Sequence, residues 1–222
     1  MTKLQYCFLL LISVSCLGLI KPNTEVETKS LFEQYLIAFK GQSFPFKMDR
    51  KAVFGMMNNA DSLFEIKDSL KIFIPEELKN SYPNSKFRSL YVLPEYNNII
   101  VVLILQDFIN EYNMRVVKNH LVSYNKSGVV LDYQELAGVT IDAWEAYLEI
   151  NSNYIIKRNL YQRRINVEKE EMKYARLIET CFEYTISTVG LIEETKKTIR
   201  EGYFEGDWTG YKFVKPIKES SN

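Results

Sequence analysis

The sequence predicts an α+β fold that is mainly β: an antiparallel meander of about eight strands with short N-terminal helices packed on it. Aromatic residues make up 14% of the chain, with 15 Tyr and 13 Phe, and these side chains are favoured on pleated surfaces. Four pairs of apolar, β-branched runs follow one another, each pair divided by a short polar break. Apolar residues at helical spacing, such as Leu31 and Tyr35, precede these runs. We therefore expect a helical part at residues 31–80 and a β-meander at residues 87–205.

The clearest hairpin signal lies between Asn113 and Gly138. Two runs rich in β-branched and aromatic residues flank the polar break NKSG at residues 125–128. Gly128 can adopt the positive φ that such a turn needs. Similar breaks near residues 95, 152 and 189 predict three further hairpins, and their irregular spacing indicates a meander without a sequence repeat. Besides the central hairpin, the expected strand pairs are 87–93 with 98–108, 143–150 with 154–161, and 175–187 with 191–204.

One expected strand, Asn98 to Phe108, is apolar on both faces over most of its length. That pattern is typical of a strand buried on both sides, here with the N-terminal helix against one of them. The strand count also suits a closed up-and-down barrel, which would hold an apolar ligand against the faces of Trp144 and Phe182. The N-terminal helices and the doubly apolar strand favour an open, curved sheet covered by helices.

Three short helices are expected in the N-terminal part. The first begins near Thr28, with Thr28 or Ser30 as its cap, carries its apolar face over Leu31 to Phe39 and is ended by Gly41. The second covers Asp49 to Met57, with Asp49 as its N-cap. The third begins at Pro75 and reaches about Asn80, a start that suits the fixed φ of proline. We expect these helices to pack on the sheet.

The first twenty residues have the features of an export signal. Lys3 supplies a positive charge, Cys7 to Ile12 supplies an apolar core, and Ser13 to Cys16 offers small residues at a cleavage point. An apolar run this short is below the roughly 18–20 residues that a membrane span needs. We therefore assign residues 1–20 to a signal segment, residues 21–30 to a polar tether and residues 31–222 to a single folded domain.

The residues around Cys16, LISVSC, are similar to a bacterial lipobox, in which a cysteine after two small residues becomes the lipidated first residue of the mature protein. That pattern prefers Leu three residues before the cysteine, where this chain has Ser13. In its signal and general style the chain resembles uncharacterised exported lipoproteins of Bacteroidota-type bacteria. The resemblance implies a lipid on Cys16 and membrane attachment in the cell envelope, at the outer membrane or in the periplasm. Plain cleavage after Ser15 or Gly18, which would give a secreted protein, and an uncleaved N-terminal anchor are the alternatives.

Charge and cysteine content narrow the classes of partner. The chain carries 28 basic and 28 acidic residues, so its zero net charge gives no electrostatic reason to expect a nucleic-acid partner. If Cys16 carries a lipid, Cys181 is the remaining thiol of the mature chain. An internal disulfide and a CxxC zinc site are then excluded. We expect no cofactor and no metal site.

Few patterns in the sequence point to catalysis. The chain has one histidine, His120, and lacks the GxSxG, HExxH, GxxxxGK[ST] and GxGxxG motifs. We therefore expect His120 to be a hydrogen-bonded or solvent-facing residue of the scaffold. Cys181 has no basic residue two positions away that would lower the pKa of its thiol, so we assign no catalytic residue. Paired acids such as Glu205 and Asp207 are the remaining generic option.

The C-terminal segment from Gly202 to Tyr211 is rich in glycine, aromatic residues and acids. Such a composition suits a carbohydrate- or peptide-binding surface, and equally a strap, over residues 206–222, that covers an open sheet edge. The function predicted is an exported, envelope-anchored binding or structural protein whose partner is an envelope protein, a peptide or a glycan. A small glycan-directed hydrolase that uses the acids of this segment is the alternative. The candidate binding residues are Tyr203, Glu205, Asp207, Trp208 and Tyr211.

Overall fold

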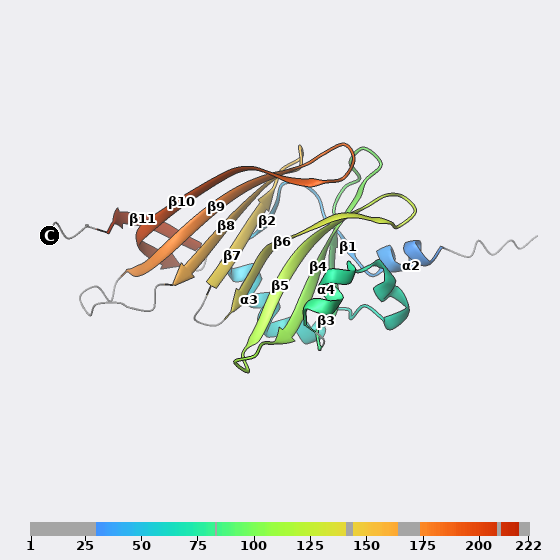
Figure 1. Ribbon diagram of the computed structural model, residues 1–222, viewed down its shortest axis with the longest axis horizontal. Helices are drawn as coiled ribbons and strands as arrows, with labels where there is room; N and C mark the ends of the chain where they lie inside the picture. The colour runs from blue at the N-terminus through green and yellow to red at the C-terminus, as the bar shows by residue number, and fades with distance from the viewer. Residues whose placement is uncertain (1–29, 83, 141–143, 164–173, 208–209, 218–222) are drawn as a thin grey trace, which may run out of the picture. The chain divides into compact units, whose positions relative to one another are not determined.

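An eleven-stranded, mostly antiparallel sheet dominates the computed structural model, which describes residues 30–82, 84–140, 144–163, 174–207 and 210–217 (Figure 1). From Leu31 onward the described residues belong to one compact unit. The strands are β1 (Lys40–Gly41), β2 (Phe46–Met48), β3 (Lys86–Val92), β4 (Ile100–Ile109), β5 (Arg115–Tyr124), β6 (Val130–Thr140), β7 (Trp144–Ile150), β8 (Ile155–Arg163), β9 (Ala175–Ile186), β10 (Ile192–Asp207) and β11 (Gly210–Pro216).

From β3 to β11 each strand pairs with the next in the chain, so the sheet is a meander of sequential neighbours. β1 lies outside β3 and pairs with it in parallel, through Lys40 with Tyr91 and Gly41 with Val92. β2 lies off this path and pairs with the C-terminal half of β7. The sheet is open, with β1 and β11 as its edges.

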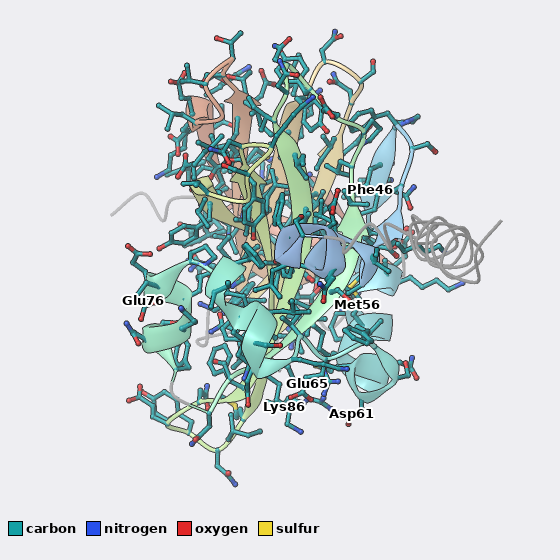
Figure 2. All side chains as sticks on the ribbon, turned by 90° about the vertical axis from the view of Figure 1, so that its right-hand side faces the viewer. Phe46, Met56, Asp61, Glu65, Glu76 and Lys86 are labelled. Carbon is teal, nitrogen blue, oxygen red and sulfur yellow. The ribbon has the colours of Figure 1, made fainter. Side chains whose placement is uncertain are left out.

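Helices cover both faces of the sheet. α3 (Arg50–Asn59) lies behind the sheet in the view of Figure 1 and packs on β5, β6 and β7. α4 (Glu76–Ser81) lies in front, on the side that also carries α2 (Leu31–Ile37) and the 3-10 helix η2 (Asp68–Phe73). Figure 2 shows the same division, with Met56 of α3 and Glu76 of α4 on opposite sides. A second 3-10 helix, η1 (Ala60–Ser62), follows α3.

The expectation of a mainly β, antiparallel meander is confirmed, but the number of strands is wrong. Each of the eight expected strands has a counterpart among β3 to β10, and β1, β2 and β11 are additional. β1 and β2 have two and three residues, which is too short for an alternating pattern to be recognised. In the region expected as a C-terminal strap, β10 continues to Asp207 and β11 pairs back along it.

The N-terminal helices are close to those expected. α2 ends at Ile37, two residues earlier than predicted, and the following residues leave the helix so that Lys40 and Gly41 can pair with β3. Asp49 is the N-cap of α3, and its Oδ1 accepts a hydrogen bond of 3.0 Å from the backbone N–H of Ala52. α4 begins directly after Pro75.

Four of the strand connections have the same turn structure. The backbone N–H of the fourth residue donates to the carbonyl of the first, and the side-chain oxygen of the first residue accepts from the N–H of the fifth. The fourth residue has a positive φ, as expected for a type I turn that ends in a bulge. The first and fourth residues of these turns are Asn110 and Asn113, Asn125 and Gly128, Asn151 and Tyr154, and Ser187 and Gly190.

The sheet is buried on both faces at β4, as its sequence predicted. Val101, Leu103 and Leu105 point into a large core that also contains Val53 of α3. Val102 and Ile104 point to the opposite face, into a second core beneath α2 and η2. Residues of this size contribute about 1.5–3 kcal/mol each when fully buried, so the two cores hold helices on both sides of the sheet.

The predicted signal segment, tether and lipidated Cys16 lie outside the described residues. Among the residues that the structure describes, no helix combines the length and the apolar character needed to cross a membrane.

Candidate functional site

A pocket of about 570 Å³ lies where three distant parts of the chain meet. The sheet face of β7 and β8 provides one wall, the β10–β11 hairpin a second, and the junction between β2 and α3 a third. The residues that line it include Lys47, Met48, Asp49, Tyr147, Glu149, Lys157, Asn159, Tyr161, Glu205, Asp207, Tyr211 and Lys212.

The alternation of the strands decides which side chains face the pocket. In β7, Tyr147 and Glu149 point to this face, while the alternating Leu148 and Ile150, the register partners of Met48 and Phe46, point to the other. Asn159 of β8 is the register partner of Tyr147, so the two side chains stand side by side.

Three tyrosine rings make up the aromatic part of the pocket. The ring of Tyr161 lies between the other two, with its centroid 5.7 Å from that of Tyr147 and 4.9 Å from that of Tyr211. The hydroxyls of Tyr147 and Tyr211 both donate to the carboxylate of Glu145, and the hydroxyl of Tyr161 donates to Oε1 of Glu179 at 2.8 Å. All three residues line the pocket: Tyr211 is half-buried, whereas Tyr147 and Tyr161 are 7% and 4% exposed and present only small parts of their surfaces to it. We call Tyr147, Tyr161 and Tyr211 the tyrosine floor.

Arg50, the first residue of α3, holds the parts of the site together. Its Nε lies 2.9 Å from Oε2 of Glu145, and its Nη1 donates to the backbone carbonyl of Asp207 at 3.1 Å. The guanidinium also lies over the ring of Tyr211, 4.9 Å from the centroid. One side chain therefore links α3, β7 and the β10–β11 hairpin.

The protonation of this cluster follows from its burial. Burial raises the pKa of Tyr147 and Tyr161 above the ordinary range, and the hydrogen bonds to Glu145 and Glu179 raise it further. Burial alone would lower the pKa of Arg50, but the nearby Glu145 and tyrosine hydroxyls outweigh it and raise the pKa. At neutral pH the tyrosine hydroxyls are thus neutral donors and Arg50 is charged.

The rim of the pocket is polar, and many of its side chains make no hydrogen bond or ion pair within the described residues. Within the part of the chain that the structure describes, six rim residues have side chains with no hydrogen-bond or ion-pair partner: Lys47, Glu149, Lys157, Asn159, Glu205 and Lys212. Both signs of charge occur among them, together with one amide. The pocket thus combines a fixed aromatic floor with donors and acceptors that are free to meet a ligand.

The structure brings together three of the five predicted binding residues. Glu205, Asp207 and Tyr211 line the pocket, and Tyr203 does not: its ring packs under Lys215, whose Nζ lies 5.1 Å from the centroid. Trp208 lies outside the described residues. In the C-terminal segment β11 itself forms an edge of the sheet, and the β10–β11 hairpin forms a wall of the pocket.

Sequence reasoning missed the part of the site that lies on β7 and β8. Glu145 alternates with apolar residues along its strand, a pattern that predicts a solvent-facing side chain, but it is only 6% exposed because Arg50 and two tyrosine hydroxyls neutralise and cover its carboxylate. Tyr147 shares that face with Glu145 and Glu149, and an aromatic residue between two acids was the available signal. Tyr161 and Asn159 carry no local signal.

His120 and Cys181 lie elsewhere in the fold. His120 is 3% exposed, and its Nε2 lies 2.9 Å from Oε1 of Gln106, whereas its Nδ1 has no partner among the described residues. The expectation of a hydrogen-bonded scaffold histidine is met at one ring nitrogen. Cys181 is half-buried, and burial raises the pKa of its thiol.

In the described ranges no three His, Cys, Asp or Glu side chains are grouped so that they could hold a metal ion. The sequence matches no protein-family model, and no curated protein and no solved structure shows significant similarity to the chain.

Proposed function

We propose that this chain is an exported, envelope-anchored binding protein and that the pocket on its tyrosine floor binds a glycan. The observation that carries the proposal is the combination of three adjoining tyrosine rings with a rim of unpaired polar side chains. A sugar ring presents C–H faces that pack on aromatic rings and hydroxyls that both donate and accept hydrogen bonds.

The charges around the pocket favour a neutral ligand. Lys47, Lys157 and Lys212 are balanced by Glu149 and Glu205, with Asp207 beside them. A strongly charged ligand would place like charges together on one side of the pocket, whereas hydroxyl groups can pair with ammonium and carboxylate groups alike. A neutral, polyhydroxylated ligand therefore fits this rim best.

The anchoring part of the proposal is supported by the sequence around Cys16 and by the polar residues 21–30 that separate it from the folded unit. A cysteine-linked lipid group ahead of the polar residues 21–30 would hold the domain close to a membrane. The pocket would then face ligands in the surrounding envelope.

A glycan array tests the binding proposal. The protein used is the chain from Lys21 onward, which lacks only the predicted signal segment. We expect binding to neutral glycans and little binding to sulfated or phosphorylated ones. Absence of binding to every neutral glycan on the array would contradict the proposal.

A second candidate function, a glycan-directed hydrolase, is favoured by one observation. Glu205 and Asp207 line the same pocket as Glu149, so carboxylates converge on a concave surface, as glycosidic-bond hydrolysis requires. The same array glycans separate the two functions when they are incubated with the protein and analysed for shortened products. Cleavage by the wild-type chain that is lost in both Glu205→Gln and Asp207→Asn would establish the hydrolase. Glycans that bind on the array but stay intact in this incubation would establish binding without hydrolysis.

A further inference from the structure

A second, smaller hollow adjoins the pocket on the same sheet face. This hollow has a volume of about 120 Å³ and is lined by residues of β8, β9 and β10, including Cys181 and Thr198. It shares Lys157 and Asn159 with the pocket, so the two spaces adjoin at these two residues of β8.

Two rows of side chains run across the strands through both spaces. In the first row Tyr147, Asn159, Cys181 and Thr198 are successive register partners from β7 to β10. In the second row charges alternate from strand to strand, in the order Lys47, Glu149, Lys157, Glu183 and Lys196.

The two rows run perpendicular to the strands, and the number of strands they cross sets the length of the combined surface. Neighbouring strands lie about 4.8 Å apart, so the row from β7 to β10 spans roughly 14 Å, well beyond the width of one sugar ring. The alternating charges nearly cancel along the second row, and each strand step offers one donor-rich and one acceptor-rich side chain. A repeated, uncharged ligand with hydroxyls along its length matches this pattern.

We propose that the pocket and the hollow form one groove that binds a linear, neutral oligosaccharide of several residues laid across β7 to β10. This inference rests on the proposed function and deepens it by naming the class of glycan. One sugar ring stacks on the tyrosine floor, and the chain continues past Asn159 over Cys181 and Thr198. Affinity therefore depends on the length of the chain.

A bulky side chain in the hollow tests the inference. Thr198→Trp fills the hollow, while Ile199→Trp, at the next residue of β10, projects from the opposite face and is the matched control because Ile199 is 65% exposed. The probes are linear oligosaccharides of glucose, of N-acetylglucosamine and of xylose, each from one to six residues long.

The wild-type chain and Ile199→Trp are expected to bind the best of these series at least tenfold more tightly at four residues than at one. In Thr198→Trp this gain should be lost, while the affinity for the shortest binding member stays the same. Isothermal titration of each protein with each length provides the comparison.

Cys181 provides a second readout that needs no substitution. In the chain from Lys21 onward it is the only thiol, since Cys7 and Cys16 precede that residue. The four-residue probe should slow alkylation of Cys181 by iodoacetamide several-fold, and the one-residue probe should leave the rate unchanged.

The outcomes separate the groove from the pocket. Equal affinity for one and four residues, or equal behaviour of Thr198→Trp and Ile199→Trp, would overturn the extended groove and leave the glycan pocket intact. Failure of all probes together with a negative array would overturn the proposed function, and the groove with it.

Discussion

His120 shows how burial sets the chemistry of a single residue in this fold. Its Nε2 faces Oε1 of Gln106, whose amide nitrogen donates to Oγ of Ser85 at 2.9 Å, so the amide oxygen is left to accept from the imidazole N–H. Burial lowers the pKa of His120 to about 4; Glu135 opposes this shift, and the charges of Lys118 and Arg158 add to it. The sequence placed His120 on a strand, but it could not show that this strand face is covered.

This shift predicts a pH-dependent stability. The folded-state pKa of His120 lies below its unfolded value of 6.5, so the unfolded state binds more protons between pH 6.5 and pH 4. The contribution of His120 to the free energy of unfolding is complete above pH 6.5. It is lost as the pH is lowered through this window, by up to about 3 kcal/mol. Urea unfolding between pH 7 and pH 5 is expected to show a weaker decline in His120→Gln than in the wild-type chain. An identical decline in both proteins would count against a buried, neutral His120.

At the same scale, the site residues divide into those that the sequence could reveal and those that it could not. Glu205, Asp207 and Tyr211 lie within seven residues of one another, so their composition drew attention to them. Tyr161 and Arg50 belong to the site only because folding brings β8 and α3 to the β10–β11 hairpin. No sequence pattern near either residue predicts this long-range contact.

Among the elements, the turns were the most predictable. Asn125 and Gly128 marked a turn in the sequence because an asparagine side chain can bond the backbone ahead of it and glycine accepts a positive φ. The turn that begins at Asn110 was not predicted, although it has the same hydrogen bonds and a positive φ at Asn113. Short strands such as β2 lack a detectable sequence pattern. Its three residues adopt a strand conformation because they pair with β7.

Gly128 provides a test of the turn structure. It has a φ of 86°, and an added Cβ would lie 2.6 Å from the ring of Phe32 and 2.9 Å from that of Phe73. Gly128→Ala is expected to destabilise the protein by about 1–3 kcal/mol, from the strained backbone and the displaced rings. Thermal unfolding followed by circular dichroism measures the change.

Gly55 is the matched control, because it lies inside α3 and an added Cβ would meet no atom within 4 Å. Gly55→Ala is expected to stabilise the protein by about 0.5–1 kcal/mol through the better helix propensity of alanine. Equal effects of the two substitutions would show that neither the turn conformation nor the contact with Phe32 matters.

For the molecule as a whole, the meander was predictable because its contacts are local in sequence. Each strand from β3 to β11 pairs with the next, so hairpin signals alone determine the order. The pocket was not predictable, since it joins residues near positions 48, 147, 160 and 207 that meet only in the folded unit. Long-range contacts of this kind depend on how the helices pack on the whole sheet.

The proposed membrane attachment also concerns the whole molecule, and Cys16 provides its test. We expect the wild-type chain, expressed in a bacterium that lipidates exported proteins, to incorporate a labelled fatty acid and to fractionate with membranes. Cys16→Ala should lose the label and move to the soluble fraction, since one thioether-linked lipid group provides the attachment. A wild-type chain without label, and with the same fractionation as Cys16→Ala, would refute the lipid anchor.

The central claim is that the pocket on the tyrosine floor binds a glycan, and titration of two asparagine variants with an array-selected glycan tests it most directly. Asn159 lines the pocket with a side chain that is unpaired within the described ranges, whereas Asn153 is exposed in the β7–β8 turn. Asn159→Ala is expected to weaken binding by about tenfold through the loss of hydrogen bonds to the ligand, while Asn153→Ala binds as tightly as the wild-type chain. Equal affinities for all three proteins would contradict the claim.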